Sequence, residues 1–249
     1  NAKRFEADNV AMAADKGISF LRLGADAGDG ASTYEKAAVI KQHGTKVRYS
    51  LMKAYVLSPK ELAEEAKMLA DCGLDEITIM DSAGTMMPHE TEAYTKELVA
   101  AVDIPVAFHG HNNLGLSVAN AIAAAEAGAT VFDCGLLGMA RSAGNCATEL
   151  LVATFQRLGY FKDIDLYKLL AFLDGELIPA MEEYNYHVAV KPFDLILGLA
   201  GCHSSFTKRF QNIADEMGVP LYQLIVEVSK RDQKAPSEEL IRQIAADLV

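Results

Sequence analysis

Short apolar, β-branched runs alternate with helical patterns along the first 160 residues. Each run is followed by a turn and a helical pattern, and a new run begins after roughly 25 to 30 residues. The runs cover residues 18–24, 46–52, 76–80, 104–111 and 130–135. Strands that alternate with helices in this way predict a parallel sheet whose connections are right-handed crossovers.

Helical patterns precede the first run and fill the intervals after it, at residues 4–16, 32–44, 58–73, 88–102, 114–128 and 148–158. Ser32 with Glu35, and Ser58 with Glu61, have the spacing of a capping box, in which a serine and a glutamate close the start of a helix. Gly44, Gly73 and Gly128 are predicted to end the helices that precede them.

Two architectures fit five strand–helix units. One is an open, doubly wound sheet of five strands, and the other is part of a (β/α)8 barrel. The barrel requires about 90 further residues ahead of Asn1, because each unit takes about 30 residues.

The rhythm changes after Gly159, where the remaining patterns are all helical. Ser237 is predicted to be the N-cap of the last helix, with Glu238 and Glu239 in its first turn. The pattern predicts two parts, an alternating strand–helix region at residues 1–160, which is the barrel portion if the barrel applies, and a helical region at residues 161–249.

The composition excludes several classes of protein. A formal net charge of −11 is unsuited to binding nucleic acid or an anionic membrane surface. No apolar stretch reaches membrane-spanning length. The four cysteines show no C-x-x-C spacing, which is typical of reduced, mostly buried thiols in a cytoplasmic protein.

The segment FHGHNNLG, residues 108–115, carries the densest candidate chemistry. His109 and His111 stand two residues apart at the carboxyl end of a predicted strand, so both side chains point to the same face. In parallel α/β folds, ligands bind at this end of the strands. The pair can hold a metal ion, or one histidine can cap the next helix while the other is a core residue.

Further polar residues stand at neighbouring strand ends. Asp81 and Asp133 are candidate carboxylate ligands, although Asp81 is also a candidate turn cap and Asp133 can orient a neighbour. Ser82 can donate a hydrogen bond to a bound carboxylate. Asn145, in the glycine-rich loop 135–149, either caps the following helix or lies at an anion site at that helix N-terminus.

A longer string then indicates a family. The string at 108–151, FHGHNNLGLSVANAIAAAEAGATVFDCGLLGMARSAGNCATELL, resembles the seventh and eighth strand units of the DRE-TIM metallolyases. MDSAGTM, at 80–86, resembles their sixth strand unit. YSLMKAYVLSPKELAEEAKML, at 49–69, resembles the fifth unit of the 4-hydroxy-2-oxovalerate aldolase branch. The resemblance implies a (β/α)8 barrel of which strands 4–8 lie in this chain, followed by the helical region.

The resemblance also implies a function, namely metal-dependent cleavage of a 4-hydroxy-2-oxo acid to pyruvate and an aldehyde. It implies that His109 and His111 are ligands of a divalent ion, with Mn²⁺ expected and Mg²⁺, Co²⁺ or Zn²⁺ as alternatives. Ser82, His109 and Asn145 are the implied substrate-binding residues. The implied partners are a small 2-oxo acid, further copies of the chain, and an aldehyde dehydrogenase.

Two departures leave alternatives open. The D-x-T-L-R-D-G motif of the family's first strand, with its metal carboxylate and arginine, and the aldolase base histidine are not among these residues. His203 stands where the aldolase has a tyrosine and is a candidate base. An acyl-CoA lyase or synthase, or a non-catalytic partial barrel, therefore remains possible. The 249 residues alone are expected to bind metal weakly and to show little aldolase activity.

Overall fold

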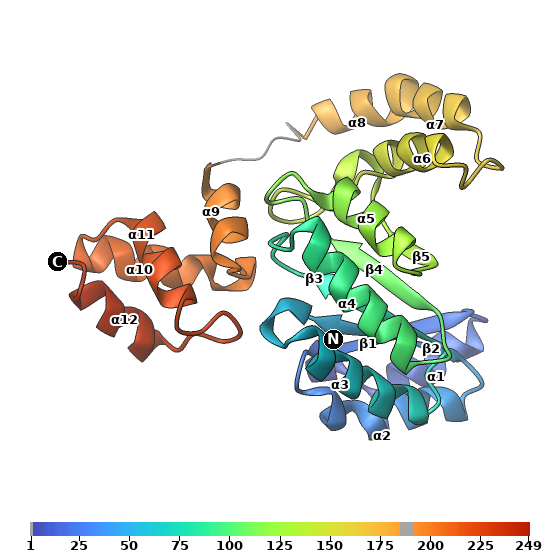
Figure 1. Ribbon diagram of the computed structural model, residues 1–249, viewed down its shortest axis with the longest axis horizontal. Coiled ribbons are helices and arrows are strands. Elements are labelled where there is room, and N and C mark those ends of the chain that lie inside the picture. The colour runs from blue at the N-terminus through green and yellow to red at the C-terminus, as the bar shows by residue number, and fades with distance from the viewer. Residues whose placement is uncertain (1, 185–191) are drawn as a thin grey trace. The chain divides into compact units, whose positions relative to one another are not determined.

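A computed structural model describes residues 2–184 and 192–249. Five strands form one sheet in the order β1–β2–β3–β4–β5 (Figure 1). Their bounds are Phe20–Asp26, Lys46–Met52, Glu76–Asp81, Val106–Gly110 and Val131–Asp133. β2 pairs in parallel with both β1 and β3. All five strands lie where the apolar runs predicted them, with differences of up to two residues at the ends.

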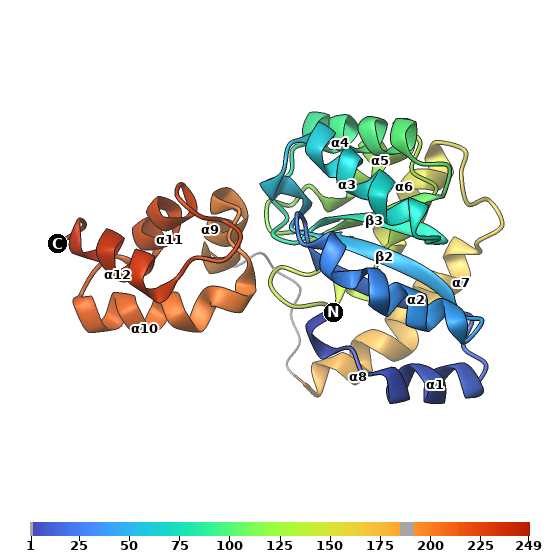
Figure 2. The same ribbon diagram turned by 90° about the horizontal axis from the view of Figure 1, so that it is seen from below.

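The strand order decides between the two architectures. A doubly wound sheet reverses its order at a switch point, whereas this sheet adds each strand beside the previous one. Right-handed crossovers in a constant direction leave the connecting helices on one face. Figures 1 and 2 show α2, α3 and α4 together on one face of the sheet. The sheet therefore forms part of a (β/α)8 barrel, as predicted.

Six helices accompany the strands in residues 2–160. They are α1 Ala7–Asp15, α2 Tyr34–Gln42, α3 Pro59–Asp71, α4 Pro88–Ala101, α5 Ser117–Glu126 and α6 Thr148–Arg157. The predicted capping box at Ser32 and Glu35 is wrong. Ser32 lies inside a 3-10 turn, Gly30–Thr33, and its hydroxyl donates to the carbonyl of Asp29, so it cannot cap α2.

The capping box at Ser58 is confirmed. The Ser58 hydroxyl accepts from the backbone N–H of Glu61, and the Glu61 carboxylate accepts from the backbone N–H of Ser58. We expect Ser58→Ala to lower the free energy of unfolding by about 1 kcal/mol, because the backbone N–H of Glu61 at the start of α3 loses its acceptor. Urea unfolding measures this loss. Ser32→Ala is the matched control and should change it by less than about 0.5 kcal/mol; equal losses would contradict the assignment.

The two faces of the sheet differ in polarity. The helix-covered face carries Tyr49, Leu51, Ile77 and Ile79, which are at most 1% exposed. On the opposite face, Arg22, Arg48 and Glu76 are neighbours in the strand register. Both arginines pair with the buried Glu76 carboxylate, at 3.5 and 3.3 Å. The face opposite the helices, which is the inner face of the barrel, is therefore polar. Ligands bind in barrels at the carboxyl ends of the strands.

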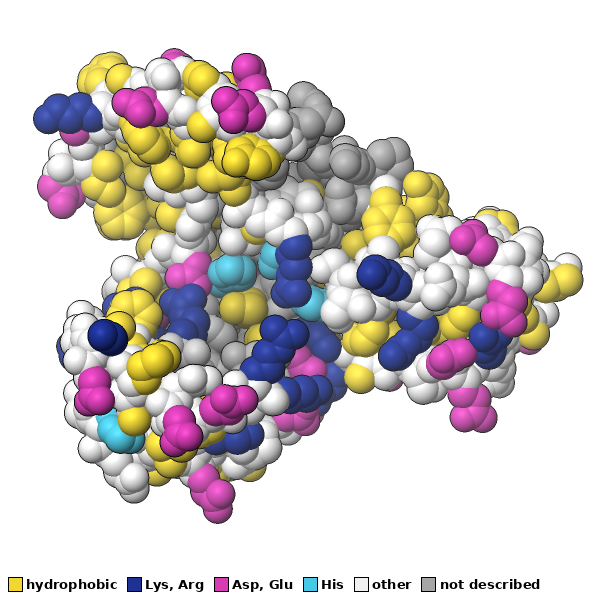
Figure 3. Space-filling view, turned by 180° about the vertical axis from the view of Figure 1, so that it is seen from behind, with side chains coloured by type: hydrophobic (Ala, Val, Ile, Leu, Met, Phe, Trp, Pro, Cys, Tyr) yellow, Lys and Arg dark blue, Asp and Glu magenta, His cyan; other side chains and the backbone are white. Residues whose placement is uncertain are grey.

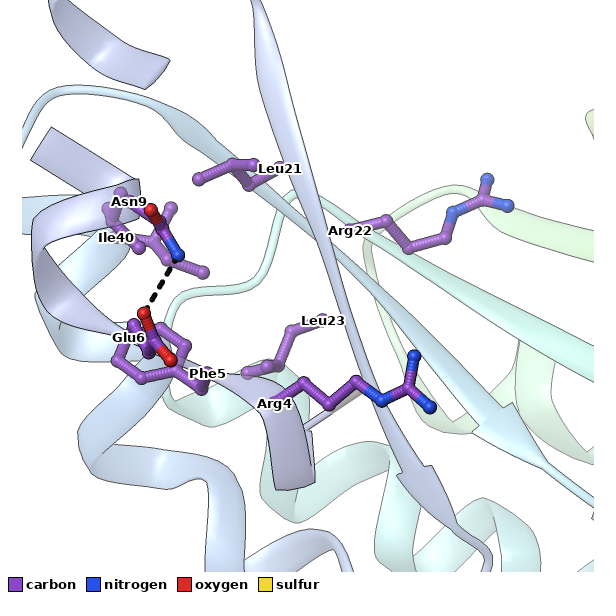
Figure 4. Close-up of a pocket in the computed structure, with 9 residues that line it drawn as sticks. Arg4, Phe5, Glu6, Asn9, Leu21, Arg22, Leu23 and Ile40 are labelled. Atoms are coloured by element: carbon purple, nitrogen blue, oxygen red, sulfur yellow. Dashed lines mark hydrogen bonds between the residues drawn. The ribbon is translucent and has the colours of Figure 1, made fainter. Parts of the chain in front are cut away.

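The outer edge of β1 lies beside the N-terminal segment of the chain. In the strand order β1 has one neighbour, β2, as expected for the strand that carries Leu21. A pocket of about 160 Å³ lies between β1 and the start of α1 (Figure 4). Its lining includes Arg4, Phe5, Leu21 and Leu23. The segment before β1 and β1 itself therefore line one pocket.

By its internal contacts the chain divides into two compact units. Unit 1 comprises Asn1–Ser82, Met86–His109 and Ala123–Phe132, and unit 2 comprises Ala83–Thr85, Gly110–Ile122 and Asp133–Val249. The predicted boundary at residue 160 stays a prediction.

The C-terminal region is helical, as predicted. Its helices are α7 Leu166–Phe172, α8 Ile178–Glu182, α9 Pro192–Ala200, α10 Thr207–Met217, α11 Leu221–Ser229 and α12 Glu238–Ala246, with a π-helical segment at Leu173–Leu177. Phe210, Leu224 and Ile241 are fully buried in a core that this region forms. The Ser237 hydroxyl caps α12, accepting from the N–H of Leu240. No helix of the described ranges has the length and apolarity needed to cross a membrane.

Candidate functional site

Polar side chains stand at the carboxyl ends of the first three strands, all within unit 1. Asp26 is the last residue of β1, Lys53 directly follows β2, Asp81 ends β3 and Ser82 follows it. The carboxyl ends of parallel strands meet at one edge of a sheet, and this edge carries the ligand site in barrels. The residues therefore share the edge at which the sequence predicted a site.

Asp81 acts as a turn cap. Its Oδ2 accepts a hydrogen bond from the backbone N–H of Met86 at 3.0 Å, and the residue is fully buried. A buried carboxylate engaged in this way holds the loop that follows β3. This agrees with the cap reading of Asp81 and gives no support to its role as a metal ligand.

Ser82 is tied to Lys53. Its Oγ accepts from the backbone N–H of Lys53 at 2.9 Å, so the hydroxyl keeps its own proton to donate. The Lys53 ammonium pairs with the Asp26 carboxylate at 3.1 Å, and only 7% and 15% of these side chains are exposed. Lys53 has a φ of 55°, in the left-handed region that lysine rarely adopts.

Asp26 and Lys53 were not among the predicted site residues. The signal that would have found them is their position, because each closes an apolar run, as Asp81 does. The sequence could not show that two residues 27 positions apart form a partly buried pair.

The histidines lie at the end of β4. His109 is in the strand and partly exposed, and His111 comes just after it and is 5% exposed. Alternation along the strand puts the two side chains on one face. On the face drawn in Figure 3, lysine and arginine side chains gather beside histidine side chains.

Within unit 2, the glycine-rich loop is laid along the residues that follow β4. His111 and Asn145 form an isolated β-bridge, flanked by hydrogen bonds from Cys146 N to Gly110 O and from Asn112 N to Gly144 O. Asn145 does not cap the next helix, whose N-cap is Ala147. That reading is wrong because the bridge holds Asn145 three residues before α6.

The Asn145 side chain has an unsatisfied acceptor. Its Oδ1 is buried and accepts no hydrogen bond from the described residues. A buried acceptor without a donor costs free energy, so this atom needs a cation or a donor that the described residues do not supply. Because the bridge places Asn145 beside His111, such a ligand would also meet that histidine.

Two glycines permit the close packing of this loop. A Cβ on Gly84, whose φ is +60°, would lie 2.6 Å from both Asn113 N and His111 O. A Cβ on Gly144, with φ +86°, would lie 2.2 Å from the carbonyl oxygen of Gly138. Neither position has room for a residue with a side chain. The glycine in MDSAGTM is therefore required by the backbone of the histidine segment.

The two remaining predicted residues are placed differently. Asp133 ends β5 and is partly exposed. His203 is buried in unit 2, with Nε2 2.7 Å from Nη2 of Arg141 and Nδ1 2.8 Å from Oγ of Ser205. A guanidinium only donates, so it occupies the Nε2 lone pair that a base needs. This arrangement does not favour His203 as the base.

Other metal-ligand or nucleophilic groupings are lacking in the described ranges. No cluster of three or more His, Cys, Asp or Glu side chains there could hold an ion. All four cysteines are free, and Cys72 is exposed. Burial raises the pKa of the Cys146 thiol to about 12, so it is protonated at neutral pH and a poor nucleophile.

Family comparisons cover most of the chain. Residues 22–174 match the HMGL-like family, and residues 188–249 match the DmpG-like communication domain. The chain is 35% identical over 95% of its length to 4-hydroxy-2-oxovalerate aldolase 2 of Rhodococcus jostii, and spans 68% of that protein. It is 33% identical over 95% of its length to 4-hydroxy-2-oxovalerate aldolase of Geobacillus genomosp. 3, and spans 69% of it.

Solved structures share the fold. Rhizobium etli pyruvate carboxylase matches 98% of this chain with a TM-score of 0.77 at 17% identity, and the chain spans 26% of that protein. This likeness concerns the barrel architecture alone. The extent and identity of the sequence matches show that the chain belongs to the HMGL-like family, in the branch of the 4-hydroxy-2-oxovalerate aldolases.

Proposed function

We propose that the protein is a divalent-metal-dependent lyase that cleaves a 4-hydroxy-2-oxo acid to pyruvate and an aldehyde, and condenses them in reverse. The relatives at 33–35% identity are aldolases of this kind by name. The observation that carries the proposal within the structure is the bridge between His111 and Asn145, with the unsatisfied Oδ1 of Asn145.

The donor set suits a first-row divalent ion. His109 and His111 lie one strand step apart and offer two imidazole nitrogens, and the Asn145 amide offers an oxygen. A cation beside Asn145 would satisfy its buried acceptor. When bound, the ion supplies Lewis-acid stabilisation of the negative charge that develops on the 2-oxo acid during cleavage.

The chain's own residues bind and orient the substrate. Ser82 can donate its hydroxyl proton to the pyruvyl end, because the bond from the Lys53 N–H uses only a lone pair of Oγ and leaves the proton available. In cleavage the C3–C4 electron pair goes to the pyruvate half as its enolate, the 4-hydroxyl proton leaves, and the aldehyde carbonyl forms. A proton then returns to C3. We assign no base, because both ring nitrogens of His203 are engaged by neighbours.

Finer parts of the proposal come from the resemblance. Mn²⁺ is the ion that the resemblance implies. The region matching the DmpG-like communication domain supports an aldehyde dehydrogenase partner. A homo-oligomer and a cytoplasmic location, the latter supported by four free cysteines, complete the proposal.

The test measures pyruvate release from 4-hydroxy-2-oxovalerate by a lactate dehydrogenase assay. In a protein that also carries the family's first-strand motif, a chelator should abolish activity and Mn²⁺ should restore it, whereas the 249 residues alone should show little activity. A parallel reaction with 3-hydroxy-3-methylglutaryl-CoA covers the acyl-CoA lyase alternative. Release of acetyl-CoA without pyruvate release would overturn the proposal, and inactivity with both substrates would favour a non-catalytic barrel.

A further inference from the structure

The glycine-rich loop of unit 2 holds two residues in strained backbone conformations. Four non-glycine residues of the described ranges have a positive φ, and two of them, Leu137 at 54° and Ser142 at 61°, lie in this loop. Leucine rarely enters the left-handed region, because its Cβ comes too close to the backbone there. Such strain persists only where surrounding contacts enforce it, and it is concentrated at functional sites. A contact must therefore hold Leu137 in this conformation.

Glu149 supplies such a contact. It lies in the first turn of α6, is half-buried, and its Oε2 accepts a hydrogen bond from the backbone N–H of Leu137 at 3.1 Å. Because the peptide group is planar, φ of Leu137 can change between fixed neighbours only if the plane between Leu136 and Leu137 turns. The N–H would then leave the carboxylate. A hydrogen bond to a charged acceptor is about twice as strong as a neutral one, so Glu149 opposes this relaxation directly.

The segment that Glu149 holds lies against Asn145. The carbonyl oxygen of Gly138, the next residue, accepts a hydrogen bond from the backbone N–H of Asn145 at 2.9 Å. A Cβ on Gly138 would lie only 2.9 Å from the carbonyl oxygen of Asn145, so the two backbones are in close contact. On its other side, Asn145 forms the bridge with His111. A shift of the held segment would therefore move the Asn145 side-chain amide relative to His111.

Glu149 also has a simpler possible role. A glutamate in the first turn of a helix is stabilised by the helix dipole, whatever lies beside it. That role needs only the negative charge, whereas the contact with Leu137 needs an acceptor oxygen at one place. A glutamine at this position keeps the oxygen and removes the charge, so it separates the two roles.

We propose that Glu149 is a positioning residue, which holds Leu137 in the left-handed conformation and thereby sets the place of the Asn145 amide oxygen at the metal site. The inference rests on the proposed function and adds to it a residue that touches neither the metal nor the substrate. Groups that orient metal ligands typically account for about 10- to 100-fold in metal affinity or activity. An effect of this size is expected from Glu149.

The first test uses the 249-residue chain without metal. Hydrogen exchange of single backbone N–H groups, followed by NMR, reports the hydrogen bonds that Leu137 and Asn145 donate. Glu149→Ala should speed the exchange of both N–H groups by at least about fivefold, the factor that corresponds to one lost hydrogen bond. Glu149→Gln should leave both rates close to those of the unmodified chain.

The second test measures Mn²⁺ affinity by calorimetry in a protein that also carries the family's first-strand motif. Glu149→Ala should weaken binding by about 10- to 100-fold, and Glu149→Gln should not. Leu137→Gly in the Glu149→Ala background should restore most of the affinity, because glycine adopts a positive φ without being held there. If Glu149→Ala does not fold, Glu149→Asp, whose carboxylate is one methylene shorter, should show the same loss and carries the test.

Glu239→Ala is the matched control, because Glu239 is an exposed glutamate in the first turn of α12. It removes a charge at a helix start and should change neither the Mn²⁺ affinity nor the two exchange rates. An unchanged affinity in Glu149→Ala, equal losses in Glu149→Ala and Glu149→Gln, or no rescue by Leu137→Gly would overturn the positioning proposal alone. Absence of Mn²⁺ binding in the unmodified protein would reject the proposed function itself, and the positioning role with it.

Discussion

His111→Ala is expected to lower the metal-dependent release of pyruvate by at least about 10³-fold, and His109→Ala to have an effect of the same order. Each variant removes one of two imidazole donors, and the described part of the chain holds no larger ligand cluster that could replace it. Lewis-acid stabilisation is worth several kcal/mol, and each 1.4 kcal/mol is a factor of ten in rate. Pyruvate release at saturating Mn²⁺ measures the loss, and calorimetric titration with Mn²⁺ measures the affinity.

His89→Ala is the matched control, because His89 is an exposed histidine on α4. The activity and the Mn²⁺ affinity of the His89→Ala variant should equal those of the unmodified protein. Thermal unfolding shows whether the two site variants keep their fold. Activity retained in either variant would exclude a metal role for that histidine.

Gly84→Ala is expected to lower the free energy of unfolding by about 2–5 kcal/mol and to weaken Mn²⁺ binding. The left-handed φ of +60° costs about 1–2 kcal/mol with a side chain. The new Cβ would also lie 2.6 Å from His111 O and Asn113 N, and forcing such an overlap costs typically 1–3 kcal/mol. Because the overlap falls on the backbone of His111, the imidazole should also move.

Gly44→Ala separates these two causes. Gly44 has a φ of +72° and nothing within 4 Å of its would-be Cβ, so only the conformational cost applies. Urea unfolding should show a loss of about 1–2 kcal/mol for Gly44→Ala, with Mn²⁺ affinity unchanged. Equal losses in the two variants would show that the contact with His111 carries no free energy.

The strands were predictable because each is an apolar run bounded by turn residues, and Ser58 was predictable because its capping box is local. Ser32 has the same spacing, but a 3-10 turn outcompetes the cap. Whether the sheet is doubly wound or part of a barrel depends on which strands pair, and the periodicity of the sequence does not contain this information. The prediction of a barrel came from the family resemblance.

The candidate site also has parts that the sequence predicted and parts that it could not predict. The histidines were found because alternation along one strand is a local rule. The contact of Asn145 with His111, and that of Lys53 with Asp26, join residues 34 and 27 positions apart. No pattern along the chain encodes such contacts. The N-cap reading of Asn145 was wrong for this reason, since a pairing with a distant segment replaced the local cap.

The sequential strand order also has a consequence for how the protein is made. Phe20 pairs with Lys46, and Arg48 pairs with Glu76, so these pairings close loops of only 26 and 28 residues. Loop closure costs little extra free energy at this length, and short separations favour fast folding. Each strand leaving the ribosome meets a neighbour that has already been synthesised, whereas a doubly wound sheet must wait for strands across its switch point. The barrel portion can therefore grow by one strand–helix unit at a time during translation, at about 5–20 residues per second.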